Sequence, residues 1–329
     1  MCCLFGIYNY SGKKNDKINS LVNALANEAT ERGTDATGIS YIKDDKMIIY
    51  KKPLPAYKMK FKGLQDAVCV TGHTRHSTQG NKELNYNNHP FMGYCENTKF
   101  TLAHNGVLFN DLELRKSLNL PVTKIKTDSY IATQLLEHYH NVNVQNIQKM
   151  SESLEGSFCF SIMDMDNTLY LVKGDNPLYI INLPKYNLYV YASTDEILFR
   201  ALINTEFFDE IKAGNFEEVK LRSEQILTIN SKGDLQYNDF KQKRSYYNYG
   251  RSVHWWTYND YTGDWDYIQE DKPEVEAQED KKTKTKTLDE EYLDELKEIG
   301  KYYGYDASDI QYLRDSGYTF DEIEDLFYN

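Results

Sequence analysis

The chain has 329 residues, 40% of them apolar, which is enough for one large domain and a smaller addition. Its net charge of −12 lies almost entirely in residues 270–329, which hold 19 Asp/Glu and 8 Lys/Arg. Neither part offers a concentrated basic face, so nucleic-acid binding is disfavoured. No segment resembles a membrane span or a secretory signal. We therefore expect a cytoplasmic protein that binds neither nucleic acid nor membrane.

The cysteines and histidines argue against a disulfide framework and a metal site. Five cysteines at irregular spacing, without a C-x-x-C pair, indicate a reducing compartment. The seven histidines show neither an H-E-x-x-H pattern nor Cys/His pairing at ligand spacing. Structural or surface roles are therefore expected for the histidines.

Residues 2–230 alternate between strand-like and helical segments. Apolar periodicity predicts strands at 3–8, 38–42, 46–50, 67–74, 100–104, 157–164, 168–172, 178–181 and 188–192. Helices are expected from Ile18 to about Arg32-Gly33, at 127–139 and from Thr194 or Asp195 toward Ile203, with a polar loop at 76–90. This is too rich in strands for a helix bundle and lacks the βαβ rhythm of a doubly wound sheet.

The composition changes after this region. Residues 231–268 form an extension rich in Tyr and Trp, and residues 269–287 are charged and almost free of large apolar groups, as in a linker. Residues 288–329 show three short helical patterns. We interpret them as a small acidic three-helix module with a thin core.

Cys2 becomes chemically distinctive if Met1 is removed, because one residue then carries a thiol and a free α-amine. The reference pKa of an α-amine, about 7.7–8, allows it to serve as the general base for the thiol. Alone, a cysteine here is more often a small apolar residue at a chain end. The motifs that follow it favour the catalytic interpretation.

Four motifs occur in order: Cys2 with Phe5-Gly6-Ile7, then ERGTDATGI at 31–39, GHTRHSTQG at 72–80 and LAHNG at 102–106. Their order and spacing resemble the class II, or N-terminal-nucleophile, glutamine amidotransferases. The resemblance is closest to the glutaminase domains of glucosamine-6-phosphate synthase and amidophosphoribosyltransferase, and it covers about residues 2–205. The sequence HSTQG at 76–80 departs from the family's usual aromatic-Ala-Thr-His-Gly or Tyr-Ser-Thr-Ala-Gly.

Asn105 and Gly106 are the predicted oxyanion donors. Thiolate attack on an amide places negative charge on the former carbonyl oxygen, which needs hydrogen-bond donors. An Asn side chain donates, and a Gly lets its own N–H approach closely. In the families that the chain resembles, this pair has that role. Without the resemblance, Asn-Gly is also common as a turn after a strand.

Free glutamine presents a carboxylate and an ammonium, and both need partners in a selective site. The guanidinium of Arg75 matches a carboxylate. The resemblance assigns the α-ammonium to Asp128 and a further substrate contact to Thr78. Without the resemblance, Asp128 would be interpreted as a negative charge that stabilises the first turn of a helix. Arg32 and Asp35 are expected to support the fold around the nucleophile.

The resemblance implies an α+β fold, the N-terminal-nucleophile hydrolase αββα sandwich, with Cys2 at the end of a central strand. It implies that the thiolate attacks the side-chain amide of L-glutamine, ammonia leaves, and water hydrolyses a γ-glutamyl thioester without any metal or organic cofactor. Roughly 100 residues after the core are too few for a second catalytic domain. A synthetase or transferase partner is therefore expected to accept the ammonia.

Two other classes stay open. An N-terminal-nucleophile amidohydrolase would keep Cys2 and the oxyanion donors but cleave another amide. A regulatory or assembly protein would keep the fold without turnover, and retention of Met1 would favour it.

Overall fold

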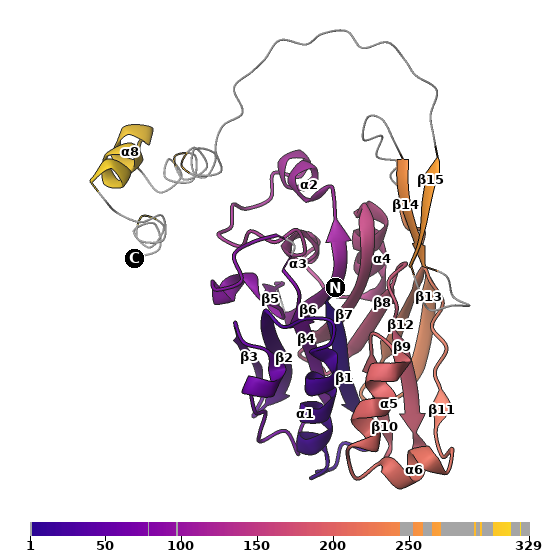
Figure 1. Ribbon diagram of the computed structural model, residues 1–329. Coiled ribbons are helices and arrows are strands. Elements are labelled where there is room, and N and C mark those ends of the chain that lie inside the picture. Colours follow the sequence, from indigo (N-terminus) through magenta and orange to yellow (C-terminus); the bar gives the residue numbers. More distant parts are fainter. Residues whose placement is uncertain are drawn as a thin grey trace. The chain divides into compact units, whose positions relative to one another are not determined.

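The computed structural model describes residues 2–77, 79–96, 98–243, 253–258, 265–270, 293, 297, 305–316 and 323. The chain divides into two compact units, Met1–Glu270 and Asp271–Asn329. Two large antiparallel sheets with helices on their outer faces make up most of the first unit (Figure 1). The predicted α+β sandwich is therefore confirmed.

The first sheet has seven strands in the order β11-β9-β10-β1-β4-β2-β3. They are β1 (Cys3–Asn9), β2 (Ala36–Lys43), β3 (Lys46–Lys52), β4 (Cys69–Arg75), β9 (Tyr179–Leu183), β10 (Leu188–Ala192) and β11 (Glu217–Glu218). Helices α1 (Ile18–Ala29) and α5 (Asp195–Ile203) pack on its outer face, and α6 (Phe208–Lys212) follows α5. The apolar stripe of α1 supplies much of this core.

The second sheet has six strands in the order β13-β12-β8-β7-β6-β5. They are β5 (Phe91–Tyr94), β6 (Lys99–Leu108), β7 (Gly156–Asp164), β8 (Leu169–Lys173), β12 (Gln225–Ile229) and β13 (Leu235–Asp239). Helices α3 (Tyr130–His138) and α4 (Val144–Ser153) pack on its outer face, and α2 (Asp111–Ser117) precedes them. Short 3-10 turns lie at Ala56–Lys58, Asn85–Asn87 and Pro184–Tyr186.

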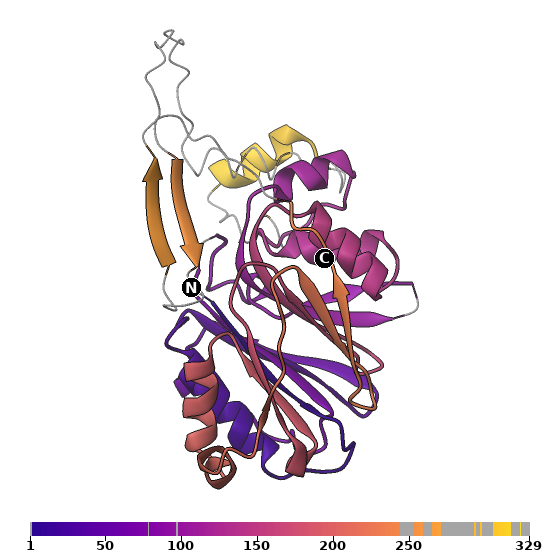
Figure 2. The same cartoon turned by 90° about the vertical axis from the view of Figure 1, so that its right-hand side faces the viewer.

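The alternation of side chains along β1 explains the layering. Phe5 and Ile7 face the helices, whereas Leu4 and Tyr8 belong to the core between the two sheets. Both faces of β1 are buried, because helices cover one face and the second sheet covers the other. Figure 2 shows the two sheets with helices on both outer sides.

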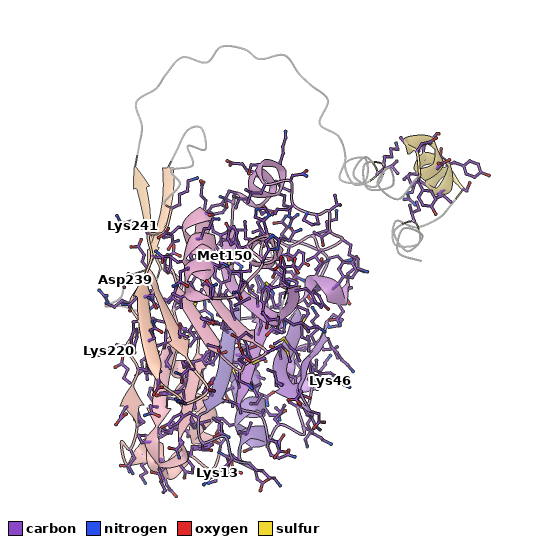
Figure 3. All side chains as sticks on the ribbon, turned by 180° about the vertical axis from the view of Figure 1, so that it is seen from behind. Lys13, Lys46, Met150, Lys220, Asp239 and Lys241 are labelled. Carbon is purple, nitrogen blue, oxygen red and sulfur yellow. The ribbon has the colours of Figure 1, made fainter. Side chains whose placement is uncertain are left out.

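The surface and the interior differ as expected from composition. Charged side chains such as Lys13, Lys46 and Lys220 are exposed, and they project outward in Figure 3. Met150 on α4 is completely buried. Each outer helix therefore presents its apolar side to a sheet and its polar side to water.

Several elements differ from the expectations. Strand β6 continues through Asn105 and Gly106 to Leu108, so this pair lies within a strand and not in a turn. Helix α3 starts at Tyr130, and Asp128 therefore precedes the helix that it was expected to open. Strand β5 and helices α2 and α4 were not predicted, because each is short or weakly apolar.

The extension after residue 230 contributes to the sandwich. Strand β13 pairs with β12 at the edge of the second sheet, beyond the expected boundary. The strands β14 (Val253–Tyr258) and β15 (Trp265–Glu270) form an antiparallel pair. In the second unit, α8 (Ala307–Asp315) begins with a capping box at Asp306. Residues 271–287 of the expected linker and most of the expected three-helix module lie outside the described residues.

Candidate active site

Cys2 lies directly before β1 in the middle of the first sheet. Because Cys3 pairs with Thr74 of β4, Cys2 lies beside Arg75 and His76 at the same end of the sheet. The N–H of His76 donates to Cys2 Sγ at 3.4 Å, and Sγ is 3.5 Å from the His76 carbonyl oxygen. Arg32 Nε donates to the Cys2 carbonyl at 2.9 Å, so this arginine holds the chain end in place.

The surroundings of the Cys2 thiol keep it protonated at neutral pH. Burial raises the pKa of Cys2, and the N–H of His76 and the charge of Arg75 offset only part of this effect. Because the thiolate is the nucleophilic form, a base has to remove the proton before attack.

A narrow pocket connects Cys2 with residues from both sheets. It is lined by Cys2, Arg75, His76, Gln79, His89, His104, Gly106, Thr127, Asp128 and Ser129. The structure thus brings four of the expected site residues together: Cys2, Arg75, Gly106 and Asp128. Thr78 lies outside the described residues.

Gly106 occupies a position that only glycine can fill. Its φ is +149°, and an added Cβ would lie 1.9 Å from the carbonyl oxygen of Ser157 on the neighbouring strand β7. The backbone of β6 therefore approaches β7 closely while Gly106 itself faces the pocket.

Asn105 is buried next to this glycine but does not line the pocket. Its Nδ2 lies 3.4 Å from Ser193 Oγ, which also accepts a 2.9 Å hydrogen bond from the N–H of Leu4 on β1. Its carbonyl oxygen accepts from Asn176 Nδ2 at 2.7 Å. The side chain of Asn105 thus lies near Leu4 at the start of β1, and Leu4 is two residues after Cys2.

Arg75, the last residue of β4, is buried and held on two sides. One terminal nitrogen donates to Asn88 Oδ1 at 2.6 Å, and the other donates to the carbonyl oxygens of Gly80 at 3.1 Å and of Gln79. Asp35 holds the same loop, because it accepts from the N–H of Ser77 at 2.8 Å. The guanidinium therefore lies at a fixed position on the pocket wall.

Asp128 is also buried, and it connects the pocket to β6. Its Oδ2 accepts from the N–H of Leu108 at 2.7 Å, and its Oδ1 lies 3.4 Å from Ser129 Oγ. Ser129 in turn contacts His104 Nδ1 at 2.8 Å. Arg75 and Asp128 thus place charges of opposite sign on one pocket.

Three residues of the site were missed in the sequence. Asn88 fixes Arg75, His104 holds Ser129, and His89 lines the pocket with neither ring nitrogen hydrogen-bonded within the described residues. The ring of His89 contacts those of His73 and Phe91, at centroid distances of 4.2 and 4.4 Å. The only signal for Asn88 and His89 was the N-N-H-P run at 87–90, whose polar residues fit an ordinary loop, whereas His104 lies in the LAHNG motif but was given no role in the site.

Other classes of site are not seen in the described part of the chain. It contains no group of three or more His, Cys, Asp or Glu side chains arranged for a metal ion. All five cysteines are free thiols. None of its helices has the length and apolar character needed to cross a membrane.

Comparisons with known proteins point to one family. Residues 73–200 match the family described as "Glutamine amidotransferase domain". Over 212 residues the chain is 25% identical to 7-cyano-7-deazaguanine synthase 2 of Sulfurisphaera tokodaii, covering 60% of this chain and 44% of the relative. Over 201 residues it is 28% identical to glutamine–fructose-6-phosphate aminotransferase [isomerizing] of Fusobacterium nucleatum, covering 59% and 32%. The chain thus spans less than half the length of each relative.

A solved structure shares the fold. Glutamine phosphoribosylpyrophosphate amidotransferase from B. subtilis, complexed with ADP and GMP, superposes with a TM-score of 0.58 at 20% identity, over 74% of this chain and 50% of that one. Together with the family match, this similarity confirms the resemblance seen in the motifs. Residues 73–200 thus match a glutamine amidotransferase domain, and the sandwich shares the fold of that solved amidotransferase.

Proposed function

We propose that this chain performs the glutaminase half-reaction, in which Cys2 hydrolyses the side-chain amide of L-glutamine and releases ammonia. The single observation that carries the proposal is the pocket shared by Cys2, Arg75, Gly106 and Asp128. It combines a nucleophile, an N–H donor and one charge of each sign. Those are the groups that a free amino acid with a reactive amide requires.

The two charges on the pocket support glutamine as the substrate. Arg75 would bind the α-carboxylate, and Asp128 would bind the α-ammonium. Arg75 donates to the carbonyl oxygens of Gln79 and Gly80 in the free protein, and a bound carboxylate would compete with them for its N–H donors.

The reaction follows from the groups around the amide. After loss of Met1, the α-amine of Cys2 takes the thiol proton, and the thiolate attacks the amide carbon. The N–H of Gly106 would donate to the oxyanion, and the side chain of Asn105 would donate as well after it leaves Ser193 Oγ, because it does not line the pocket in the free protein. The C–N bond then breaks, the protonated amine returns its proton to the leaving nitrogen, and ammonia departs. Water hydrolyses the thioester to glutamate and restores the thiol.

The ammonia would serve an acceptor that a partner synthetase or transferase binds. The two curated relatives are themselves a synthase and an aminotransferase by name.

The test compares glutamate release by the wild type, Cys2→Ala and Cys95→Ala, with hydroxylamine present to trap the thioester as a hydroxamate. Cys95 is also partly exposed but lies outside the pocket, which makes it the matched control. We expect Cys2→Ala to lower turnover roughly 10³-fold or more and Cys95→Ala to leave it unchanged.

Other outcomes identify the alternatives. A thioester formed from another amide, but none from glutamine, would identify an amidohydrolase of different specificity. Glutamate release that survives in Cys2→Ala would overturn the proposal. An intact mass that retains Met1, together with no hydroxamate from any amide, would indicate a regulatory protein.

A further inference from the structure

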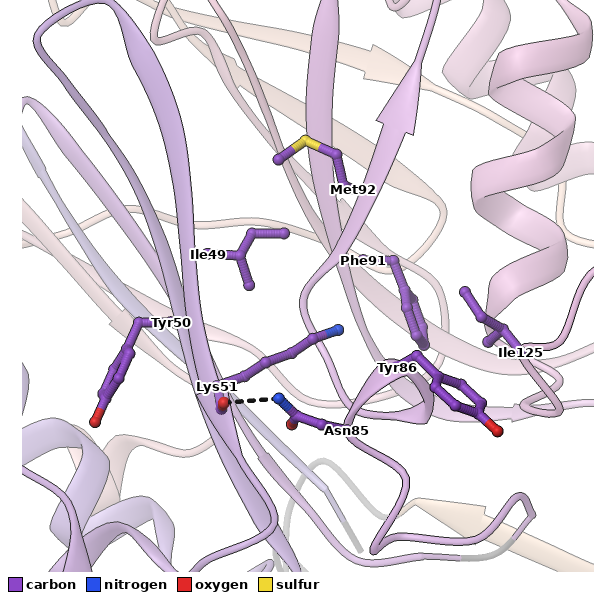
Figure 4. A pocket seen from close by; sticks show the side chains of 8 residues that line it. All are labelled: Ile49, Tyr50, Lys51, Asn85, Tyr86, Phe91, Met92 and Ile125. Atoms are coloured by element: carbon purple, nitrogen blue, oxygen red, sulfur yellow. Dashed lines mark hydrogen bonds between the residues drawn. The ribbon is translucent and has the colours of Figure 1, made fainter. Parts of the chain in front are cut away.

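A second and larger pocket lies away from Cys2, where the edge strands β3 and β5 of the two sheets face each other. Its volume is about 490 Å³, within the range of small-molecule sites. Figure 4 shows the side chains that line it: Ile49, Tyr50, Lys51, Asn85, Tyr86, Phe91, Met92 and Ile125. We call it the β3–β5 pocket. None of these residues lines the Cys2 pocket.

Lys51 is the only charged side chain among these lining residues, and it extends across the pocket in Figure 4. Its Nζ donates to the carbonyl oxygens of Pro90 at 2.9 Å and of Asn88, and lies 5.2 Å from the centroid of the Phe91 ring. Within the described residues it makes no ion pair. Lys51 is thus a partly buried cation without a carboxylate partner.

The two carbonyl oxygens compensate only part of the cost of enclosing this charge. Burial lowers the pKa of Lys51 to about 7, and the positive charge of Arg75 acts in the same direction. An ammonium has three N–H donors, and two of them are used by Asn88 and Pro90. An anion in the pocket would supply the missing opposite charge and accept the third hydrogen bond.

The other walls select for a planar apolar body. Tyr86 and Phe91 bring aromatic rings to the pocket, and Ile49, Met92 and Ile125 are apolar, whereas the ring of Tyr50 points away from Lys51 and packs edge-on against Phe61. Aromatic rings bury large areas and pack against one another in offset or edge-on geometry. Lys124, at 4.9 Å from the centroid of the Tyr86 ring, adds positive charge near this wall.

We propose that the β3–β5 pocket is a binding site for a small aromatic anion, such as an aryl carboxylate, with Lys51 as the residue that pairs with its charge. The proposal goes beyond the proposed glutaminase function and does not depend on it. Binding at this pocket requires neither Cys2 nor turnover. Its failure and the failure of the glutaminase proposal are therefore measured separately.

The charges around Lys51 predict how binding depends on pH. The groups that interact electrostatically with Lys51 are Arg75 and His73 on β4, and His89 in the loop between β4 and β5. Burial lowers the pKa of His73 to about 3 and that of His89 well below its usual value, so both are neutral around pH 7. Lys51 therefore changes charge in this range, and affinity for an anion should fall as pH rises through about 7.

The experiment measures binding of indole-3-acetate to the full chain by ligand-observed NMR, with uncharged indole-3-acetamide and inorganic phosphate as comparators. At about pH 6 we expect the carboxylate to bind roughly tenfold more tightly than the amide, and at about pH 8.5 this preference should largely disappear. Phosphate tests whether charge alone is sufficient. Binding of phosphate as tight as that of the carboxylate would overturn the aromatic part of the proposal.

Two substitutions and one control locate the ligand. Lys51→Met should abolish the preference for the carboxylate, whereas Lys52→Met should preserve it, because neighbouring residues of a strand point to opposite faces. Asn85→Asp adds a carboxylate to the wall and removes the 3.0 Å hydrogen bond from Asn85 Nδ2 to the backbone carbonyl oxygen of Lys51. It is the second variant in case Lys51→Met does not fold, and it should weaken binding of the carboxylate while binding of the amide is retained. Equal binding of acid and amide, or a preference that survives both substitutions, would overturn the proposal.

Discussion

The segment from Asn88 to Phe91 contributes to both pockets, since His89 lines the Cys2 pocket and Phe91 lines the β3–β5 pocket, yet the two are built differently. The Cys2 pocket is narrow and polar, and hydrogen bonds fix its side chains from both sheets. The β3–β5 pocket is larger and mostly apolar, with one cation at its wall. A site for chemistry needs several groups held in a fixed arrangement, whereas a binding site needs shape and one matched charge.

The largest effect that separates the two pockets should come from one residue inserted at the N-terminus. A lysine between Met1 and Cys2 blocks removal of the methionine, so the nitrogen of Cys2 stays in a peptide bond and cannot act as a base. We expect glutamine turnover to fall roughly 10²- to 10⁴-fold. Intact mass would verify the N-terminus, and indole-3-acetate binding should be unaffected. Full turnover with Met1 attached would contradict the role of the amine.

The next effect concerns the oxyanion. Asn105→Ala removes a buried amide behind Gly106, and we expect kcat for glutamine hydrolysis to fall roughly 10²- to 10³-fold with little change in KM. Asn141→Ala, an exposed asparagine, is the control and should behave as wild type. A change confined to KM would instead place Asn105 among the residues that bind the ground state.

A smaller effect is expected where Arg75 meets the substrate. Arg75→Lys keeps the charge but loses the fork that matches a carboxylate, so KM for glutamine should rise roughly 10- to 100-fold. The exposed Arg222 provides the matched control, because Arg222→Lys leaves the pocket intact. Steady-state kinetics separates KM from kcat. An unchanged KM would remove Arg75 from substrate binding.

The smallest effect should be an opposite response of the two pockets to pH. Burial raises the pKa of the Cys2 thiol, and the proposed amine base acts only when neutral, so turnover should rise between about pH 6 and 8.5. Binding of indole-3-acetate should fall over the same range, because the pKa of Lys51 is about 7. Each change should be roughly tenfold. Parallel slopes would show that one group controls both sites.

Much of the sandwich could be predicted because its strands and outer helices have clear periods. The stripe of Ile18, Leu21 and Leu25 indicated α1, and apolar runs indicated most strands of both sheets. Strand β5 and helix α4 were missed, since β5 has only four residues and α4 is mostly polar with few apolar residues to mark its buried side. The boundary at residue 230 missed β13, which owes its place to pairing with β12.

Only part of the candidate site could be predicted from the sequence. Motifs around Cys2, Arg75 and Gly106 marked residues that now line one pocket. Asn88 and His89 were not found, because their importance comes from contacts with β4 that no local pattern shows. Lys51 was not identified either, because in the sequence it is one of several lysines on an edge strand.

The sequence by itself determined the chemistry that is possible: a thiol at position 2, an arginine and an aspartate for a free amino acid, and a glycine whose N–H can approach the substrate. Only the tertiary structure decided which of these groups share a pocket, since the pairing of β1 with β4 brings Cys2 to Arg75 across more than seventy residues of chain. The tertiary structure also encloses Lys51 without a carboxylate partner among the residues it describes. Burial and charge pairing depend on which strands become neighbours, and sequence spacing does not contain that information.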